Sequence, residues 1–340
     1  MAEMHQVAVL GGGSFGTVVA NIVASNGHST KLWLRNLELA EHINQTRENS
    51  EYLPGYHLAP SLEATNDLVQ AVSSADIVFV AVPSQSFRQV ARDIAPYIKP
   101  SAAAISTTKG LEPGDFRLMS QILAEELPNN TLGVLSGPNL AKEIAAGHLT
   151  GTVIASQDEA LNVTIQQLMQ SPSFRVYGSS DMYGVELGGA LKNIYAIMAG
   201  LGAALELGQN TIGMLITRSL TEMSRFAVEE GANPLTFLGL SGVGDLIGTC
   251  SSPLSRNYRV GFALGKGQAL DDIIDELGQV AEGINTLKLV KQEADKRGVY
   301  MPLVNGLYDM LYNRKTVSEI LDGLMLAQQS HDVGFALPEN

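Results

Sequence analysis

The sequence predicts an α/β protein in which an N-terminal Rossmann-like, doubly wound sheet is followed by an all-helical C-terminal domain. Three observations lead to this prediction: an apolar run ending in a glycine-rich turn, alternating strand and helix patterns up to about residue 180, and helical patterns alone after it. A chain of 340 residues is long enough for two hydrophobic cores. We therefore expect one domain at residues 1–180 and a second at residues 181–335.

The glycine-rich turn is typical of a dinucleotide-binding fold. The apolar residues 7–10 predict a buried strand, and the small, apolar residues 17–25 predict a helix. Between them, Gly11 permits a tight turn, Gly13 lets the backbone approach a pyrophosphate, and Gly16 lets helix and strand pack closely. The first N–H groups of the helix would face the anion. The alternative is a plain glycine-rich turn in an unrelated α/β protein.

Further strand patterns follow and are separated by short helical patterns. The expected strands cover residues 6–10, 30–34, 76–82, 102–106, 132–135 and 151–156. The helices expected between them cover residues 37–45, 85–95, 116–126 and 139–145. Such alternation indicates a parallel sheet. Pro83 directly follows the third strand and cannot continue a ladder, so the chain should turn out at the carboxyl edge, where these sheets bind ligands.

Helical patterns alone follow residue 180. They cover residues 183–206, 211–230, 283–297, 303–313 and 317–327. Residues 187–205 approach the length of a membrane span, but four glycines and Lys192 favour a buried central helix of a soluble domain. Residues 239–257 form a Gly/Ser-rich loop that is longer than a connection requires, so we expect it to be functional.

Composition narrows the class of partner and the compartment. A net charge of −13 disfavours nonspecific binding to nucleic acid or to an anionic membrane surface. The single cysteine, Cys250, permits no internal disulfide, which suits the cytoplasm. Residues 1–6 lack the pattern of a secretory signal. The six histidines are not spaced as metal ligands, so we expect no metal site.

Arg35 bears on which dinucleotide binds. It follows the second expected strand, about 20 residues after the glycines, where an acidic residue would hold the ribose 2′-hydroxyl of NAD. An arginine there accommodates the 2′-phosphate of NADP, so we expect NADP to be preferred. An arginine can also stack on adenine, which leaves NAD open, and an exposed arginine at a helix start needs no ligand at all.

Two lysines are candidates for acid–base chemistry. Lys109 follows the strand 102–106 and should lie at the same sheet edge as the glycine turn. Lys192 lies inside the apolar helix, where desolvation would lower the pKa of its ammonium group toward a useful range. The alternatives are a lysine that extends its charge to solvent and an ordinary loop lysine.

The 239–257 loop carries groups that suit an anionic ligand. Its glycines can expose backbone N–H groups, and the fork of Arg256 matches a phosphate. Ser255 and Asn257 can donate further hydrogen bonds. Asp245 can pair with Lys192 or bind a substrate hydroxyl. The alternative is a solvated loop with helix-capping serines.

Taken together, these motifs resemble the NAD(P)-dependent glycerol-3-phosphate dehydrogenases, especially the bacterial form. The resemblance runs from Gly11 to about Leu326. It rests on segments 11–16, 82–84, 107–112, 135–143, 189–193, 242–249, 255–257 and 280–283.

The resemblance implies site residues by their places in these segments. It implies cofactor contacts at Ser14, Phe15, Arg35, Lys109, Ala141, Arg256, Val280 and Glu282. It implies substrate contacts at Lys109, Gly137, Asn139, Lys192, Asp245, Ser255, Arg256 and Asn257. Lys192 matches the acid–base residue of the family, with Lys109 as its expected helper. Asn139 departs from the serine or threonine that is frequent there.

The resemblance also implies an activity. It is the reduction of dihydroxyacetone phosphate to sn-glycerol 3-phosphate, the backbone of phospholipids, by a protein that is commonly a homodimer. Two other classes fit part of the sequence. A two-domain dehydrogenase of a β-hydroxy acid would share the build and the Lys-Asn pair, and a non-catalytic NADP-binding sensor would not need Lys192.

Overall fold

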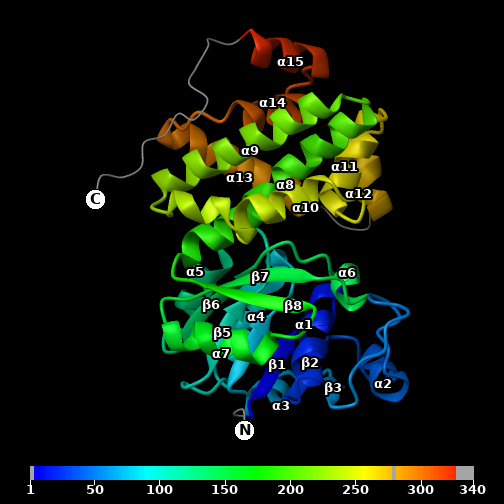
Figure 1. The fold of residues 1–340 in the computed structure, drawn as a ribbon, viewed down its shortest axis with the longest axis vertical. Helices are drawn as coiled ribbons and strands as arrows, with labels where there is room; N and C mark the ends of the chain where they lie inside the picture. The colour runs from blue at the N-terminus through cyan, green and yellow to red at the C-terminus, as the bar shows by residue number, and fades with distance from the viewer. Residues whose placement is uncertain (1–3, 278–280, 327–340) are drawn as a thin grey trace. The chain divides into compact units, whose positions relative to one another are not determined.

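The structure, a computed structural model, describes residues 4–277 and 281–326 (Figure 1). The chain divides into two compact units. Unit 1 comprises Met1–Pro113 and Arg117–Glu186, and unit 2 comprises Gly114–Phe116 and Leu187–Asn340.

Unit 1 is built on an eight-stranded sheet of order β3-β2-β1-β4-β5-β6-β7-β8 (Figure 1). Its strands are β1 (Gln6–Leu10), β2 (Ser29–Trp33), β3 (Leu62–Thr65), β4 (Ile77–Val80), β5 (Ala103–Ser106), β6 (Thr131–Ser136), β7 (Thr150–Ala155) and β8 (Phe174–Ser179). Its helices are α1 (Ser14–Ser25), α2 (Leu37–Thr46), α3 (Leu68–Val72), α4 (Ser84–Ile94), α5 (Met119–Glu126), α6 (Ala141–Ala145) and α7 (Glu159–Met169).

Both faces of the sheet are covered, which confirms the doubly wound prediction. Successive residues of β1 point to opposite faces: Val7 and Val9 join one core, and Ala8 and Leu10 join the other. Side chains from α1, α2 and α7 fill the first core, and those from α3, α4 and α5 fill the second. The near-continuous apolar runs of the central strands reflect this burial on both sides.

The glycine turn joins β1 to α1 as the motif predicts. Gly11 has a φ of +125°, and a Cβ there would lie 2.5 Å from the carbonyl oxygen of Ala81. A Cβ on Gly16 would lie 2.0 Å from the carbonyl oxygen of Gly11. Side chains at these positions would therefore force β1, β4 and α1 apart.

The sheet differs from the prediction at its edges. The sequence patterns missed β3 and β8, which are edge strands whose exposed or polar residues weaken the apolar signal. They also missed α3 and α7. In addition, β7 runs antiparallel to β6 rather than parallel. The five-residue helix α6 rises only about 7.5 Å and is too short to return the chain along the sheet.

Unit 2 is helical in its described residues, as predicted. Its elements are α8 (Met182–Ala204, which begins in unit 1), α9 (Gln209–Glu229), the 3₁₀ helix η1 (Pro234–Leu238), the π-helical turn η2 (Leu240–Gly244), α10 (Asp245–Cys250), α11 (Arg256–Gly265), α12 (Leu270–Leu277), α13 (Glu282–Arg297), α14 (Pro302–Tyr312) and α15 (Val317–Met325). The centre of α8 is almost completely buried, as expected for a core helix. Among the described residues, none of the helices has the combined length and apolarity that a membrane crossing requires.

The prediction of a long Gly/Ser-rich loop at residues 239–257 was wrong. Most of this segment is helical, because η2 and α10 follow one another directly and Ser255 caps α11. Small residues allow the compact path: a Cβ on Gly242 would lie 2.3 Å from the carbonyl oxygen of Phe237. The side chains of Leu246 and Cys250 are buried and anchor α10. Helices α11 and α12 were likewise missed by the sequence patterns.

Candidate active site

The first group of predicted site residues surrounds the glycine turn in unit 1. Gly13 is the N-cap of α1, and a Cβ there would meet nothing within 4 Å, so the turn is open at this point. Ser14 and Phe15 begin the helix, where backbone N–H groups lack helical partners and attract anions. Sequence reasoning missed Asn49, a buried side chain that donates to the Gly12 carbonyl oxygen at 2.8 Å and so holds the turn.

Arg35 lies beside this turn. The N–H of Gly11 donates to the carbonyl oxygen of Trp33 at 2.9 Å, which ties the end of β2 to the turn. A Cβ on Gly12 would lie 2.8 Å from the Cβ of Leu34, the residue before Arg35. Arg35 itself is exposed. A flexible cation next to an open anion-binding turn suits a further phosphate group.

A second group in unit 1 gathers where β5 and β6 end. Lys109 Nζ donates to the carbonyl oxygen of Gly137 at 2.8 Å. The Asn139 side chain donates from Nδ2 to Thr152 Oγ1 at 3.0 Å. Ala141 is the first residue of α6, which packs against α1. The structure thus joins the Lys109 loop to the segment after β6, as expected for the carboxyl edge of a sheet.

Lys192 is the buried cation of unit 2. It lies on α8 with 6% of its surface exposed, and its ammonium group donates to Asp245 Oδ1 and, at 2.5 Å, to Thr249 Oγ1. Asp245 and Thr249 are four residues apart on α10, so both face the lysine. Pairing offsets the cost of burying the charge. The predicted Lys192–Asp245 pair is confirmed, whereas Thr249 was not anticipated.

A chain of amide hydrogen bonds begins at Asn193, the residue after Lys192. Asn257 Nδ2 donates to Asn193 Oδ1 at 2.9 Å, and the backbone N–H of Gly283 donates to Asn257 Oδ1 at 3.0 Å. A Cβ on Gly283 would lie 2.5 Å from the carbonyl oxygen of Asn193, so glycine is needed for this contact. The amides therefore join the start of α11 and the start of α13 to α8.

The remaining predicted residues of unit 2 lie around these helix starts. Ser255 Oγ accepts from the N–H of Tyr258 at 3.3 Å, so this serine caps α11, and a hydroxyl that accepts can also donate. Arg256 is the exposed first residue of α11. Glu282 is the first residue of α13. Val280 lies outside the described residues.

Cys250 is a packed side chain of α10. It is 5% exposed, and burial raises the pKa of its thiol to about 12, although the positive charge of Lys192 acts in the opposite direction. A thiol that stays protonated is a poor nucleophile. This finding argues against a catalytic cysteine.

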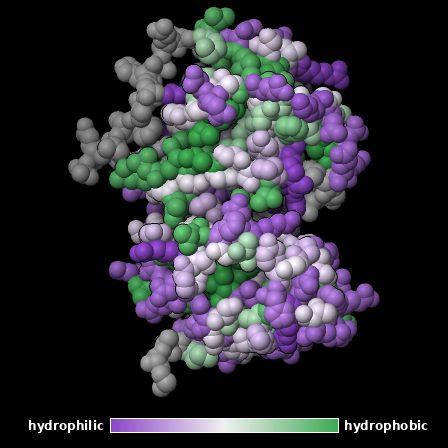
Figure 2. Space-filling model, turned by 45° about the vertical axis from the view of Figure 1, so that its right-hand side comes forward, coloured by the Kyte–Doolittle hydropathy of each residue, from purple (hydrophilic) through white to green (hydrophobic). Residues whose placement is uncertain are grey.

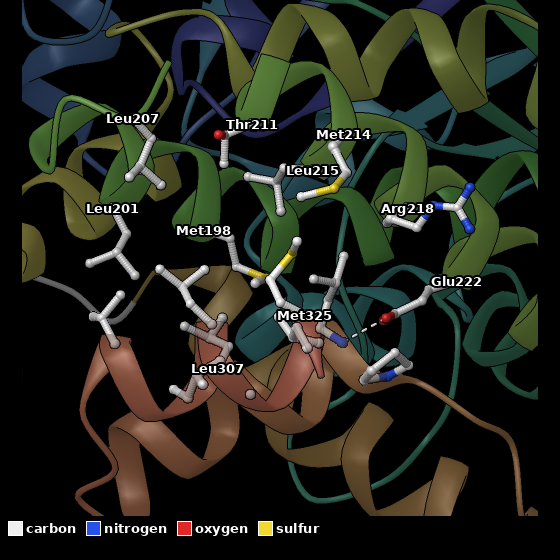
Figure 3. Close-up of a pocket in the computed structure, with 18 of the residues that line it drawn as sticks. Met198, Leu201, Leu207, Thr211, Met214, Leu215, Arg218, Glu222, Leu307 and Met325 are labelled. Carbon is white, nitrogen blue, oxygen red and sulfur yellow. Dashed lines mark hydrogen bonds between the residues drawn. The ribbon is translucent and has the colours of Figure 1, made fainter. Parts of the chain in front are cut away.

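A cavity of about 360 Å³ lies elsewhere in unit 2, among α8, α9, α14 and α15 (Figure 3). Its lining is mostly apolar, with Met198, Leu215 and Met325 among the side chains. At one side, Glu222 accepts a hydrogen bond from the N–H of Leu303 (Figure 3). None of the described residues predicted for the site lines this cavity.

Two models of protein families match the sequence of this chain. The model for the N-terminus of NAD-dependent glycerol-3-phosphate dehydrogenase matches residues 6–162, and the model for its C-terminus matches residues 181–322. The chain belongs to the NAD-dependent glycerol-3-phosphate dehydrogenase family. This result confirms the resemblance and the predicted fold class.

Individual members of the glycerol-3-phosphate dehydrogenase family match the chain along nearly its whole length. A glycerol-3-phosphate dehydrogenase of the NAD(P)+ type from Teredinibacter turnerae is 58% identical and covers 98% of each chain. One from Pseudomonas fluorescens is 54% identical and also covers 98% of each chain. The crystal structure of glycerol-3-phosphate dehydrogenase from Coxiella burnetii has a TM-score of 0.89 at 35% identity and covers 95% of this chain and 99% of that one.

Proposed function

We propose that the protein is an NAD(P)-dependent glycerol-3-phosphate dehydrogenase that reduces dihydroxyacetone phosphate to sn-glycerol 3-phosphate. The observation that carries this proposal is Lys192, a buried ammonium group held by Asp245 and Thr249, in a chain of this family. Reduction of a ketone develops negative charge on its oxygen, and a positioned cation that can donate a proton stabilises that charge.

The residues of unit 1 fit a dinucleotide. The open turn at Gly13 and the first N–H groups of α1 would hold the pyrophosphate, and Arg35 would hold the 2′-phosphate of NADP. Ser14, Phe15 and Ala141 are the further contacts that we assign to the cofactor in this unit. NADP is therefore the expected preference, with NAD accepted. A bound nicotinamide supplies the hydride for the reaction.

Lys192 acts on the substrate oxygen in this proposal. Its ammonium group donates the proton that turns the developing alkoxide into a hydroxyl, and Asp245 and Thr249 fix the direction in which Nζ points. Lys109, held by the Gly137 carbonyl oxygen, adds a second positive charge for the anionic substrate. Such orientation is worth several kcal/mol, because a positioned group needs no reorganisation as the reaction proceeds.

The start of α11 is the proposed phosphate site. Arg256 offers a guanidinium fork, Ser255 offers a hydroxyl, and the first turn of the ten-residue helix offers backbone N–H groups. Asn257 carries two N–H groups, one of which is donated to Asn193, so its amide is already oriented. We assign Glu282 and Val280 to the cofactor by their matching positions in the family.

We also propose that the enzyme is a cytoplasmic homodimer whose product supplies the backbone of phospholipids. Apolar side chains that gather on a face of the helical unit support the dimer (Figure 2). Large apolar residues of this unit that are exposed include Leu205, Met214 and Met325. The net charge of −13 supports a small-molecule substrate over nucleic acid.

The substrate assignment is tested by NADPH oxidation over a panel of small ketones. We expect the highest kcat/KM with dihydroxyacetone phosphate, because Arg256 and Ser255 suit a phosphate, and little turnover of β-keto acids of similar size. Turnover of a β-keto acid without turnover of dihydroxyacetone phosphate would contradict the proposal. Binding of NADPH without turnover of any ketone would favour a sensor instead.

A further inference from the structure

The side chain of Asn139 presents a buried acceptor that has no hydrogen-bond partner in the described part of the chain. Asn139 Oδ1 is shielded from solvent, and no described residue donates a hydrogen bond to it. A buried carbonyl oxygen left in this state is costly, so such atoms usually face a ligand or a water. The other end of the same amide, Nδ2, donates to Thr152 Oγ1 at 3.0 Å.

Thr152 decides which way this amide points. The threonine is completely buried in β7, and its hydroxyl donates its single hydrogen to the carbonyl oxygen of Ser136 at 3.1 Å. The hydroxyl oxygen can then only accept, and it accepts from Asn139 Nδ2. A flipped amide would set two acceptors against each other. Asn139 is thus held with its oxygen away from Thr152.

The same threonine also supports the segment that Lys109 binds. A Cβ on Gly137 would lie 3.1 Å from Thr152 Cα, so the backbone of residue 137 rests directly on Thr152. The carbonyl oxygen of Gly137 accepts the bond from Lys109. Thr152 therefore lies under both Gly137 and Asn139, the two residues of this segment at which the family resemblance implies substrate contacts.

We infer that Thr152 is a positioning residue that makes Asn139 a reader of hydrogen-bond donors on the substrate. This inference rests on the proposed function and deepens it. The matching donor on dihydroxyacetone phosphate is its free hydroxyl group. A carboxylate at the same place carries no hydrogen and would repel Oδ1. The pair Thr152–Asn139 thus favours hydroxyketones over keto acids.

The test compares dihydroxyacetone phosphate with hydroxyacetone phosphate, in which a hydrogen replaces the free hydroxyl. We expect the unmodified enzyme to prefer dihydroxyacetone phosphate by roughly 30-fold in kcat/KM, because the shorter substrate leaves Oδ1 unpaired. Thr152→Val keeps the shape but removes the hydroxyl. It should lower kcat/KM for dihydroxyacetone phosphate alone and reduce the preference to about 3-fold, with the KM for NADPH unchanged.

Two variants separate positioning from folding. Thr152→Ser keeps the hydroxyl and should restore the preference. Thr150→Val, on the same strand, removes a hydroxyl that donates to the His148 carbonyl oxygen and should leave both substrates unaffected. If Thr152→Val lowered kcat/KM equally for both substrates, the inference would be overturned. A raised KM for NADPH in this variant would also overturn it, because the donor that Asn139 Oδ1 accepts from would then be the nicotinamide carboxamide. Failure of the unmodified protein to reduce dihydroxyacetone phosphate would instead overturn the proposed function.

Discussion

Lys192 is the side chain on which the chemistry depends. Replacing it with methionine keeps most of the side-chain volume and removes the cation. We expect kcat to fall by roughly 10³-fold, because the substrate oxygen loses its proton donor. Steady-state NADPH oxidation with dihydroxyacetone phosphate measures this loss. A kcat within a few-fold of the unmodified enzyme would exclude Lys192 as the acid.

Stability needs its own control in this experiment. Lys192→Met removes one partner of a buried ion pair, which costs about 3–5 kcal/mol of unfolding free energy. The double variant Lys192→Met/Asp245→Asn removes both charges. It should recover most of the thermal midpoint but none of the activity. Activity that returned with the midpoint would assign Lys192 a structural role.

Arg35 separates the two cofactors. Arg35→Asp puts a carboxylate where the 2′-phosphate of NADP is proposed to bind. We expect the KM for NADPH to rise by roughly 100-fold through lost attraction and added repulsion, with NADH much less affected. Measuring both KM values in the variant tests this selectivity. Equal changes for the two cofactors would show that Arg35 does not read the 2′-phosphate.

Sequence reasoning found charged residues more readily than their hydroxyl partners. Lys192 drew attention because an ammonium group inside an apolar helix needs a partner, and Asp245 was the one acid in the glycine-rich segment 239–257. Thr249, Thr152 and Asn49 are common residue types whose roles depend on which strands and helices meet. Only the folded chain brings Thr152 under Gly137, because β7 turns back antiparallel to β6.

Buried glutamates join helices by capping their first turns. Glu222 of α9 accepts from the N–H groups of Leu303 and Val304 at 2.6 and 3.3 Å, at the start of α14. Glu186 of α8 accepts from the N–H of Ser120 at 3.0 Å, in the first turn of α5. Burial raises the pKa of each carboxyl from its ordinary 4.5 to about 7.

This raised pKa makes stability fall as the pH rises. Between pH 4.5 and about 7 the unfolded chain has lost these protons while the folded chain keeps them, so each glutamate lowers the free energy of unfolding by up to about 3 kcal/mol. Glu222→Gln removes one of these contributions. We expect a flatter dependence of the thermal midpoint on pH between 5 and 7, whatever the midpoint of the variant at any single pH.

An exposed glutamate provides the comparison. Glu159→Gln, in the first turn of α7, changes the same group where it is solvated and should keep the slope of the unmodified protein. The measurement is the thermal midpoint of the unmodified protein, Glu222→Gln and Glu159→Gln at several pH values. If the thermal midpoint of Glu222→Gln depended on pH as steeply as that of the unmodified protein, the buried Glu222 carboxyl would not cause this dependence.

The sequence predicted elements best where both faces of an element are buried. The strands β1, β4 and β5 and the helix α8 have long apolar runs and were found at nearly their observed bounds. The edge strands β3 and β8 have one neighbour each and show a weaker pattern. The helices η2, α10 and α11 were missed because glycine and serine, which favour turns, here serve close packing and capping.

The residues proposed to bind the cofactor and the substrate come from both units of the molecule. Unit 1 carries the glycine turn, Arg35 and Lys109, and unit 2 carries Lys192, Asp245 and the start of α11. The overall charge is −13, so the cations proposed for an anionic substrate are exceptions to the general charge of the protein. The alternation of strands and helices was enough to predict the fold class of the first unit, whereas predicting the function required residues from both units.

Transfer of deuterium to carbon 2 of the product, from NADPH in which deuterium replaces both hydrogens at carbon 4 of the nicotinamide, tests the proposed reaction directly. The purified protein is incubated with the labelled cofactor and dihydroxyacetone phosphate, and the product is identified by mass spectrometry and NMR. We predict sn-glycerol 3-phosphate with one deuterium at carbon 2, and none formed by Lys192→Met on the same timescale. Absence of labelled glycerol 3-phosphate from the reaction of the unmodified protein would contradict the assignment.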